Sequence, residues 1–337
     1  MAGDVPSLAS PARATGLAAA PPEVARLAAA AASYADASQA PATRRAYDSS
    51  WRAFATWCDE HQAVALPASP DVVALYLTSV AQDGRRVATL ARIVAAIGDR
   101  HRRADLPPPA SARLTEIWSG IRRAERAPQR QVRALVTADL RRAVARLPES
   151  VAGARDKALL VLAFSGALRR SELVSLELDT GRRILATSSV AFVPGGLRIS
   201  LGRSKTDQEG RGQIIAIPRG RTKLCPVTAL REWLDLSGIS AGPVFREVDR
   251  HGRVGQTPLS ARAFADVVKR AVARTGMAPE LFSGHSCRAG FVTEAASKGA
   301  TLEQIMRQTR HKKPETVLLY MREADLFSNN AAGKIGL

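Results

Sequence analysis

The sequence has few of the residues and motifs on which several common classes of protein depend. Its three cysteines, Cys58, Cys225 and Cys287, lie far apart and lack metal-site spacing, which fits a reduced, cytoplasmic compartment. No apolar run is long enough to span a membrane and the first residues lack a signal-peptide pattern, so we expect a soluble protein. Walker, Gly-x-Gly-x-x-Gly and clustered-carboxylate motifs are absent, and we expect no metal, ATP or other cofactor.

Tyrosine, lysine and acidic residues are scarce enough to be informative where they occur. Only four tyrosines occur in 337 residues, and Tyr320 is the only one after Tyr76. Eight lysines stand among 49 basic residues, and none precedes Lys157. Against 31 acidic residues the basic ones give a formal net charge of +18. This excess favours a polyanionic partner such as DNA or RNA over a basic surface kept for solubility.

Changes in composition divide the chain into successive segments. Residues 1–40, rich in Ala, Pro and Ser, are predicted to be a disordered tail. Residues 41–126 show four amphipathic patterns of helical spacing and are predicted to form a four-helix domain. A polar linker is predicted at 127–136. Residues 137–337 are predicted to form a mainly helical domain with one small antiparallel β-sheet and a C-terminal segment, 323–337.

Local signals predict where several helices begin. A side-chain oxygen before an apolar stripe marks the predicted N-caps Thr43, Ser69, Ser111, Thr137 and Thr301. Gln304 completes a capping box with Thr301, for a helix running to His311, and Pro314 is predicted to open the next helix. Alternating apolar residues over 190–201 and 213–217 predict a hairpin whose connection holds Lys205.

The first helical domain carries arginines on the polar faces of its predicted helices. Guanidinium groups suit the phosphate contacts that position a protein on a DNA duplex. A solvated face explains any one of these arginines better, so only the whole set favours DNA binding. The set comprises Arg85, Arg86, Arg92, Arg100, Arg102, Arg103, Arg122 and Arg123.

A second basic group lies near the C-terminal end of the chain. His285 and Arg288 stand three residues apart, so on a helix they share one face and can hold one anion. His311 precedes Tyr320 by nine residues. A phenol near imidazole and guanidinium groups suits phosphoryl transfer, in which catalysis is mostly positioning and charge stabilisation. Tyr320 alone would be read as a core residue of an apolar helix.

Four motifs in this order resemble those of the tyrosine recombinases (phage integrase family), nearest to the Cre-like members. GALRRSELVSL, GRSKT, GHSCR and RHKKPETVLLY are similar to the family's first box, hairpin lysine, second box and third box. TRRAYDSSWRAFATWC and LPASPDVVALYL resemble its core-binding domain. One departure is visible: many members have Leu-Gly directly before the third-box histidine, where this chain has Thr309-Arg310.

The resemblance implies a site-specific DNA recombinase that cleaves and rejoins DNA through a 3′-phosphotyrosyl intermediate, without metal or ATP. It assigns these roles: Tyr320 as nucleophile, Arg169 and Arg288 on the non-bridging phosphate oxygens, His285 in proton removal or phosphate binding, His311 as donor to the phosphate, Lys205 as general acid and Glu172 as support for a basic residue.

The resemblance also implies partners. We expect double-stranded DNA with inverted half-sites, a homodimer on one site, a homotetramer on two paired sites, and a cytoplasmic location at a bacterial nucleoid or mobile element. A type IB topoisomerase or telomere resolvase is the nearest alternative, because it shares the chemistry. A non-catalytic DNA-binding regulator is the alternative of another class, with residues 294–321 read as a helix-turn-helix.

Overall fold

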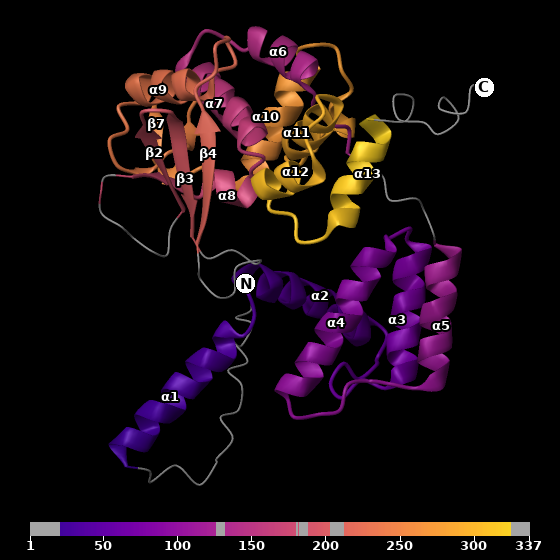
Figure 1. Ribbon diagram of the computed structural model, residues 1–337. Helices are drawn as coiled ribbons and strands as arrows, with labels where there is room; N and C mark the ends of the chain where they lie inside the picture. Colours follow the sequence, from indigo (N-terminus) through magenta and orange to yellow (C-terminus); the bar gives the residue numbers. More distant parts are fainter. Residues whose placement is uncertain (1–20, 126–131, 180, 182–187, 203–211, 325–337) are drawn as a thin grey trace, which may run out of the picture. The chain divides into compact units, whose positions relative to one another are not determined.

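The computed structural model describes residues 21–125, 132–179, 181, 188–202 and 212–324 (Figure 1). Its contacts divide the chain into two compact units, residues 1–129 and residues 130–337. None of the described helices is long and apolar enough to cross a membrane.

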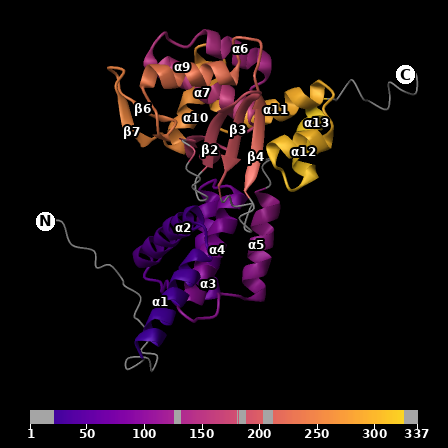
Figure 2. The same cartoon turned by 60° about the vertical axis from the view of Figure 1, so that its left-hand side comes forward.

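The first unit is built from helices alone in the part that is described. They are α1 (Pro22–Ala37), α2 (Pro41–Glu60), α3 (Pro70–Gln82), α4 (Val87–Arg103) and α5 (Ala112–Ala124). Helix α2 packs on α4, and α3 packs on α4 and α5. The apolar stripes meet in one core that includes Phe54, Leu77, Leu90 and Ile97. The predicted four-helix bundle is therefore present as α2–α5, which lie together in both views (Figures 1 and 2).

Helix α1 lies where the composition of residues 1–40 predicts a disordered tail. The segment PEVARLAAAAASYADA is helical from Pro22 to Ala37. Alanine has the highest intrinsic helix propensity, and the run of alanines supplies it here. The prediction of disorder is therefore wrong for this segment, and residues 1–20 lie outside the described residues.

Three predicted N-caps are confirmed by their hydrogen bonds. The side-chain oxygens accept from backbone N–H groups in the first turn: Ser69 from Val72, Ser111 from Leu114 and Thr301 from Gln304. The Gln304 side chain in turn accepts from the Thr301 N–H at 2.9 Å, which completes the predicted capping box.

Two predicted N-caps are wrong because the helices begin at other residues. Helix α2 begins at Pro41, since proline suits the first helical position, and this places Thr43 inside the first turn. Thr137 is itself the first residue of α6, with Val136 at the cap position. The Thr137 N–H donates to the Glu294 carboxylate at 3.2 Å, so a side chain from another helix satisfies it.

The second unit contains the remaining described helices and all the described strands. The helices are α6 (Thr137–Ala145), α7 (Val151–Ser165), α8 (Arg170–Val174), α9 (Pro226–Ser237), α10 (Ala261–Ala273), the 3₁₀ helix η1 (Pro279–Leu281), α11 (Ser286–Ser297), α12 (Leu302–Thr309) and α13 (Pro314–Ala324). The strands are β1 (Leu176–Leu178), β2 (Ser188–Val193), β3 (Gly196–Leu201), β4 (Gln213–Pro218), β5 (Gly242–Pro243), β6 (Arg246–Val248) and β7 (Val254–Pro258).

The larger sheet is mixed, where the sequence predicts an antiparallel one. Its strand order is β4-β3-β2-β1-β5. The predicted hairpin is present, with Val190 opposite Ile199 and Ile199 opposite Ile215, all of them buried. Strand β1 pairs parallel with β2, a contact that a three-residue strand does not reveal in sequence. Strands β6 and β7 form a separate pair, which no alternating apolar pattern in the sequence predicts.

Helices α11, α12 and α13 form the part of the second unit that carries the C-terminal motifs. Both views place them side by side (Figures 1 and 2), and each helix packs against the other two. Val292, Ile305 and Val317, one from each helix, make their shared core. Helix α12 ends at Thr309, two residues before the predicted end at His311, because Arg310 turns into the left-handed region.

Gly290 lets α11 approach the backbone that leads into α6. A Cβ atom at this position would lie 2.0 Å from the carbonyl oxygen of Leu135. We expect Gly290→Ala to lower the free energy of unfolding of the second unit by more than about 2 kcal/mol, since the backbones must separate. Gly120 is the matched helical control, because its added Cβ meets nothing within 4 Å.

Urea denaturation of both variants measures the difference. Gly120→Ala should stabilise α5 by roughly 0.5–1 kcal/mol, the usual gain of alanine over glycine inside a helix. A Gly290→Ala protein with unchanged stability would contradict the close approach of α11 to Leu135.

Candidate active site

The side chains predicted from the C-terminal motifs come from four separate stretches of the second unit. Arg169 and Glu172 stand at the start of α8, and Arg288 is in the first turn of α11. His311 follows α12 and Tyr320 lies on α13. The structure brings these stretches together: Arg288 donates to the carbonyls of Ala167, just before α8, and of Thr309, at the end of α12, and α13 packs on α11 and α12.

Arg288 is buried at the centre of this group, with 1% of its surface exposed. One terminal nitrogen, Nη1, donates to the Ala167 carbonyl at 2.6 Å, and Nη2 donates to the Thr309 carbonyl. Burial, with the charges of Arg169 and Arg310, lowers the pKa of Arg288 to about 9, so it remains charged at neutral pH. Arg288 therefore joins the turn before α8 to the end of α12.

Glu172 is a buried carboxylate between two guanidinium groups. Its Oε1 accepts from Arg169 Nη1 at 2.6 Å, and its Oε2 accepts from Arg310 Nη2 at 2.7 Å. Oε2 also accepts from the backbone N–H of Arg169 at 2.8 Å. Burial raises the pKa of Glu172, but Arg310 and Arg169 outweigh it and the net shift is downward. The carboxylate is therefore ionised at neutral pH and fixes both arginines.

His311 is held by the residue two places before it. Its Nδ1 lies 2.7 Å from the Thr309 hydroxyl, and the same hydroxyl donates to the Ile305 carbonyl at 2.7 Å. The hydroxyl has a single hydrogen, so Thr309 accepts from the ring when it donates to Ile305, and this places the ring proton on Nδ1. Burial, then the charges of Arg288 and Arg169, lowers the pKa of His311 from 6.5 to about 4. The ring is therefore neutral at pH 7.

This shift makes the stability of the second unit depend on pH. Between pH 6.5 and 4 the unfolded chain binds a proton at His311 that the folded chain does not, so stability is full above pH 6.5 and falls as the pH drops toward 4. We expect His311→Gln to lose less stability than the wild type between pH 7 and pH 4.5, measured by urea denaturation. If wild type and His311→Gln lost the same stability between pH 7 and pH 4.5, the lowered pKa of His311 would be contradicted.

His285 stands at the N-terminus of α11, one turn before Arg288. Its side chain is exposed, and its backbone N–H donates to the Ser283 hydroxyl at 3.1 Å. Partial desolvation by the surrounding protein, followed by the charges of Arg288, Arg169 and Arg170, lowers its pKa. The charges of Arg288 and Arg169 thus act on both histidines, one at the start of α11 and the other between α12 and α13.

Tyr320 lies on α13 at the edge of the shared core of α11, α12 and α13. It is half-buried and packs against Val292, Ile305 and Val317. It is also close enough to Arg288 for its charge to raise the pKa of that guanidinium, against the larger lowering by burial. The phenol is therefore placed by core packing, within electrostatic reach of the buried guanidinium.

Lys205 lies outside the described residues, in the connection between β3 and β4. The sequence assigned no role to Thr309 and Arg310. In the structure Thr309 contacts His311, and Arg310 contacts Glu172. The signal in the sequence was the departure from Leu-Gly at these two positions. Within the described residues, no three His, Cys, Asp or Glu side chains are placed to hold a metal ion.

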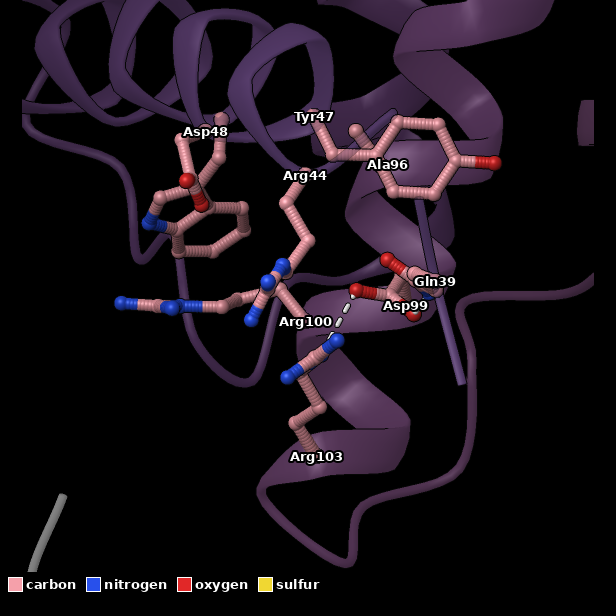
Figure 3. A pocket seen from close by; sticks show the side chains of 9 residues that line it. Gln39, Arg44, Tyr47, Asp48, Ala96, Asp99, Arg100 and Arg103 are labelled. Atoms are coloured by element: carbon pink, nitrogen blue, oxygen red, sulfur yellow. Dashed lines mark hydrogen bonds and ion pairs between the residues drawn. The ribbon is translucent and has the colours of Figure 1, made fainter. Parts of the chain in front are cut away.

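The arginine set of the first unit lies mostly on its surface. Seven of the eight are exposed and Arg100 is half-buried over the Trp51 ring, 5.6 Å from its centroid. Arg100 and Arg103 line a pocket between α2 and α4 that Arg44 and Asp99 also line (Figure 3). Asp99 accepts from Arg103 Nε at 2.9 Å, so part of this positive charge is neutralised within the pocket.

Comparison with known proteins places this architecture in one family. Residues 128–326, more than half of the chain, match the Phage integrase family. The chain is 36% identical over 305 residues to an integrase/recombinase XerD homolog of Selenomonas ruminantium, covering 88% of this chain and 86% of the relative. It is 25% identical over 294 residues to the recombinase Cre of Escherichia phage P1, covering 81% and 82%. The chain belongs to the phage integrase family of tyrosine recombinases.

Solved structures show the same fold at low sequence identity. The site-specific recombinase XerH, in a post-cleavage complex with a palindromic difH substrate, matches with a TM-score of 0.54 at 16% identity over 79% of this chain and 72% of that one. A lambda integrase (75–356) dimer bound to a COC′ core site matches with a TM-score of 0.50 at 16% identity over 75% and 79%.

Proposed function

We propose that the chain is a site-specific DNA recombinase that cuts and rejoins DNA through a covalent link between Tyr320 and a 3′-phosphate. The observation that carries this proposal is the convergence of one phenol, two histidines and a second arginine, Arg169, around the buried guanidinium of Arg288. The names of the relatives support it, since they are recombinases. A DNA-binding regulator has no use for this whole set.

The reaction is a transesterification at one phosphorus atom, in which the Tyr320 oxygen replaces the 5′-oxygen of DNA. The Tyr320 oxygen attacks the scissile phosphorus, the bond from phosphorus to the 5′-oxygen breaks, and the phenol loses its proton. The 5′-oxygen leaves with a proton as a free hydroxyl, and the reverse attack by a 5′-hydroxyl rejoins the strand. Because the phosphotyrosyl bond keeps the energy of the original ester, this sequence needs no nucleoside triphosphate.

The two arginines are suited to the negative charge that builds up on the phosphate. Arg169, with 33% of its side chain exposed, presents donors that a phosphate reaches directly. Arg288 has five N–H donors and uses two on carbonyls, but its burial means that side chains over it must shift when the phosphate enters. In the low-dielectric site its charge acts strongly even before that contact forms.

The histidines and Lys205 handle protons in this proposal. Neutral His285 accepts the phenol proton or bonds the phosphate, and His311 donates to a non-bridging oxygen once the phosphate charge favours its protonated form. Lys205 protonates the leaving 5′-oxygen from the connection between β3 and β4. The roles of the two histidines rest on their motif positions and on the surroundings described above, and the role of Lys205 rests on its motif position alone.

The proposed substrate is double-stranded DNA with inverted half-sites, bound by a dimer on one site and a tetramer on two. The exposed arginines of the first unit suit contacts with backbone phosphates. With such a substrate, we expect the protein in the cytoplasm of a bacterial cell, at the nucleoid or a mobile element.

Covalent capture tests this function even though the target sequence is unidentified. A library of duplexes with randomised inverted half-sites carries a nick near the centre, so that the short 5′-hydroxyl strand diffuses away after cleavage. We expect DNA that survives SDS on the protein to converge on one inverted sequence. Joining of two such sites separates a recombinase from a topoisomerase or telomere resolvase. Selected DNA that binds tightly but never becomes covalent would contradict the proposal and favour a regulator.

A further inference from the structure

Arg310 occupies a position that favours glycine, directly before His311. It caps the C-terminus of α12 with φ +59° and ψ +38°, in the left-handed region that disfavours residues with a Cβ. The motif that this segment resembles has glycine at the same place. An arginine here therefore costs free energy in the backbone, which its side chain has to offset.

The side chain of Arg310 turns inward, with 9% of the residue exposed. Nη2 donates to Glu172 Oε2 at 2.7 Å and to the Ala167 carbonyl at 3.3 Å, and Nη1 donates to the Gln308 carbonyl at 3.0 Å. Its buried Nε has no hydrogen-bond partner among the described residues. The unsatisfied Nε is a second destabilising feature of Arg310, and the contacts to Glu172 and Ala167 oppose it.

The two groups that Arg310 contacts, the Glu172 carboxylate and the Ala167 carbonyl, also bind the two arginines proposed to contact the phosphate. Glu172 also binds Arg169, through Oε1 at 2.6 Å and through the Arg169 backbone N–H at 2.8 Å. The Ala167 carbonyl also accepts from Arg288 Nη1 at 2.6 Å. Ala167 itself has a positive φ of 44°, so the turn that presents this carbonyl is strained and depends on its partners.

We propose that Arg310 is a positioning residue for strand transfer, which fixes the Glu172 carboxylate and the Ala167 carbonyl and through them orients Arg169 and Arg288. This inference rests on the proposed function of the same site. Glycine at position 310 fits the backbone but leaves Glu172 with one guanidinium instead of two. It also removes one of the two described guanidinium groups that donate to the Ala167 carbonyl, and the bond from Arg288 stays.

Arg310→Gly is the decisive variant, because it removes the side chain and relieves the backbone at the same time. We expect single-turnover cleavage to slow by roughly 30- to 100-fold, the usual scale for groups misplaced by about an ångström. Affinity for the selected DNA should not fall in parallel. Arg310→Lys should restore part of the rate, since one ammonium can replace Nη2, which bonds both acceptors, but cannot also replace Nη1, which donates to the Gln308 carbonyl. A cleavage rate equal to that of the wild type in Arg310→Gly would overturn the proposal.

A double-mutant cycle shows whether Arg310 acts through Glu172. Glu172→Gln combined with Arg310→Gly should slow cleavage by less than the product of the two single defects, because both variants remove support that runs through Glu172, while Arg310→Gly alone also removes a donor to the Ala167 carbonyl. Fully multiplied defects would mean that Arg310 acts independently of Glu172, and would overturn a positioning role exerted through that carboxylate. Circular dichroism and thermal melting confirm that each variant is folded at the assay temperature.

A measurement without catalysis separates this inference from the proposed function. In the wild type, the guanidinium N–H resonances of Arg169 and Arg288 should be resolved and slow to exchange in ¹H–¹⁵N spectra, and in Arg310→Gly they should broaden. If the wild type never forms a covalent complex, the proposed function fails while these resonances still decide the positioning role. Unchanged resonances in Arg310→Gly would overturn it.

Discussion

Replacing Tyr320 by phenylalanine should reduce covalent capture of DNA by at least about four orders of magnitude, the scale seen when a catalytic nucleophile is removed. Phenylalanine keeps the ring that packs against Val292, Ile305 and Val317, so the helices should remain assembled. Only the oxygen that attacks phosphorus is lost. DNA affinity and the unfolding midpoint should therefore stay close to those of the wild type.

Tyr34→Phe is the matched control for this variant, since Tyr34 is 78% exposed on α1 in the first unit. Both proteins are incubated with the selected nicked duplex, denatured in SDS and run side by side. The control should form the same covalent band as the wild type. A band that persists in Tyr320→Phe would mean that another residue is the nucleophile.

Replacing Arg288 should damage both the fold and the reaction. Arg288→Ala removes the Arg288 donor from the Thr309 carbonyl, leaves the Ala167 carbonyl with the 3.3 Å bond from Arg310, and opens a buried space, so we expect a loss of about 2–4 kcal/mol in stability. Arg288→Lys keeps a charge but cannot bond both carbonyls at once. We expect it to fold and to cleave roughly 100- to 1,000-fold more slowly, as when one donor to a developing oxyanion is lost.

Arg307→Lys is the matched control, because Arg307 is exposed on α12 and pairs with the exposed Glu303 at 2.7 Å. An exposed ion pair of this kind contributes less than about 1 kcal/mol. Urea denaturation and single-turnover cleavage of both lysine variants give the comparison. An Arg288→Lys protein as fast as Arg307→Lys would remove Arg288 from the proposed chemistry.

Local signals in the sequence predicted much of the helical structure, and their failures have physical causes. Ser69 with Pro70 and Thr301 with Gln304 mark helix starts because each pair acts within one turn. Thr43 failed as a cap since Pro41, two residues earlier, opens the helix more strongly. The parallel pairing of β1 with β2 joins segments that carry no local signal for each other.

The candidate site, too, was predicted from the sequence only in part. Motif spacing was sufficient to select Arg169, Arg288 and His311, which the structure places within electrostatic reach of one another. The role of Arg310 was hidden, because the sequence shows an arginine where a glycine suits the backbone but does not show where its side chain goes. Only the fold reveals that it turns inward to Glu172.

The central claim is that Tyr320 becomes covalently joined to DNA. After covalent capture, nuclease digestion leaves a short nucleotide on the protein, and tandem mass spectrometry of the proteolytic peptides locates it. We predict a 3′-phosphonucleotide on Tyr320, in the peptide that contains the α13 sequence PETVLLYMREA. A nucleotide on any other residue, or covalent DNA attached through a 5′-phosphate, would contradict this claim.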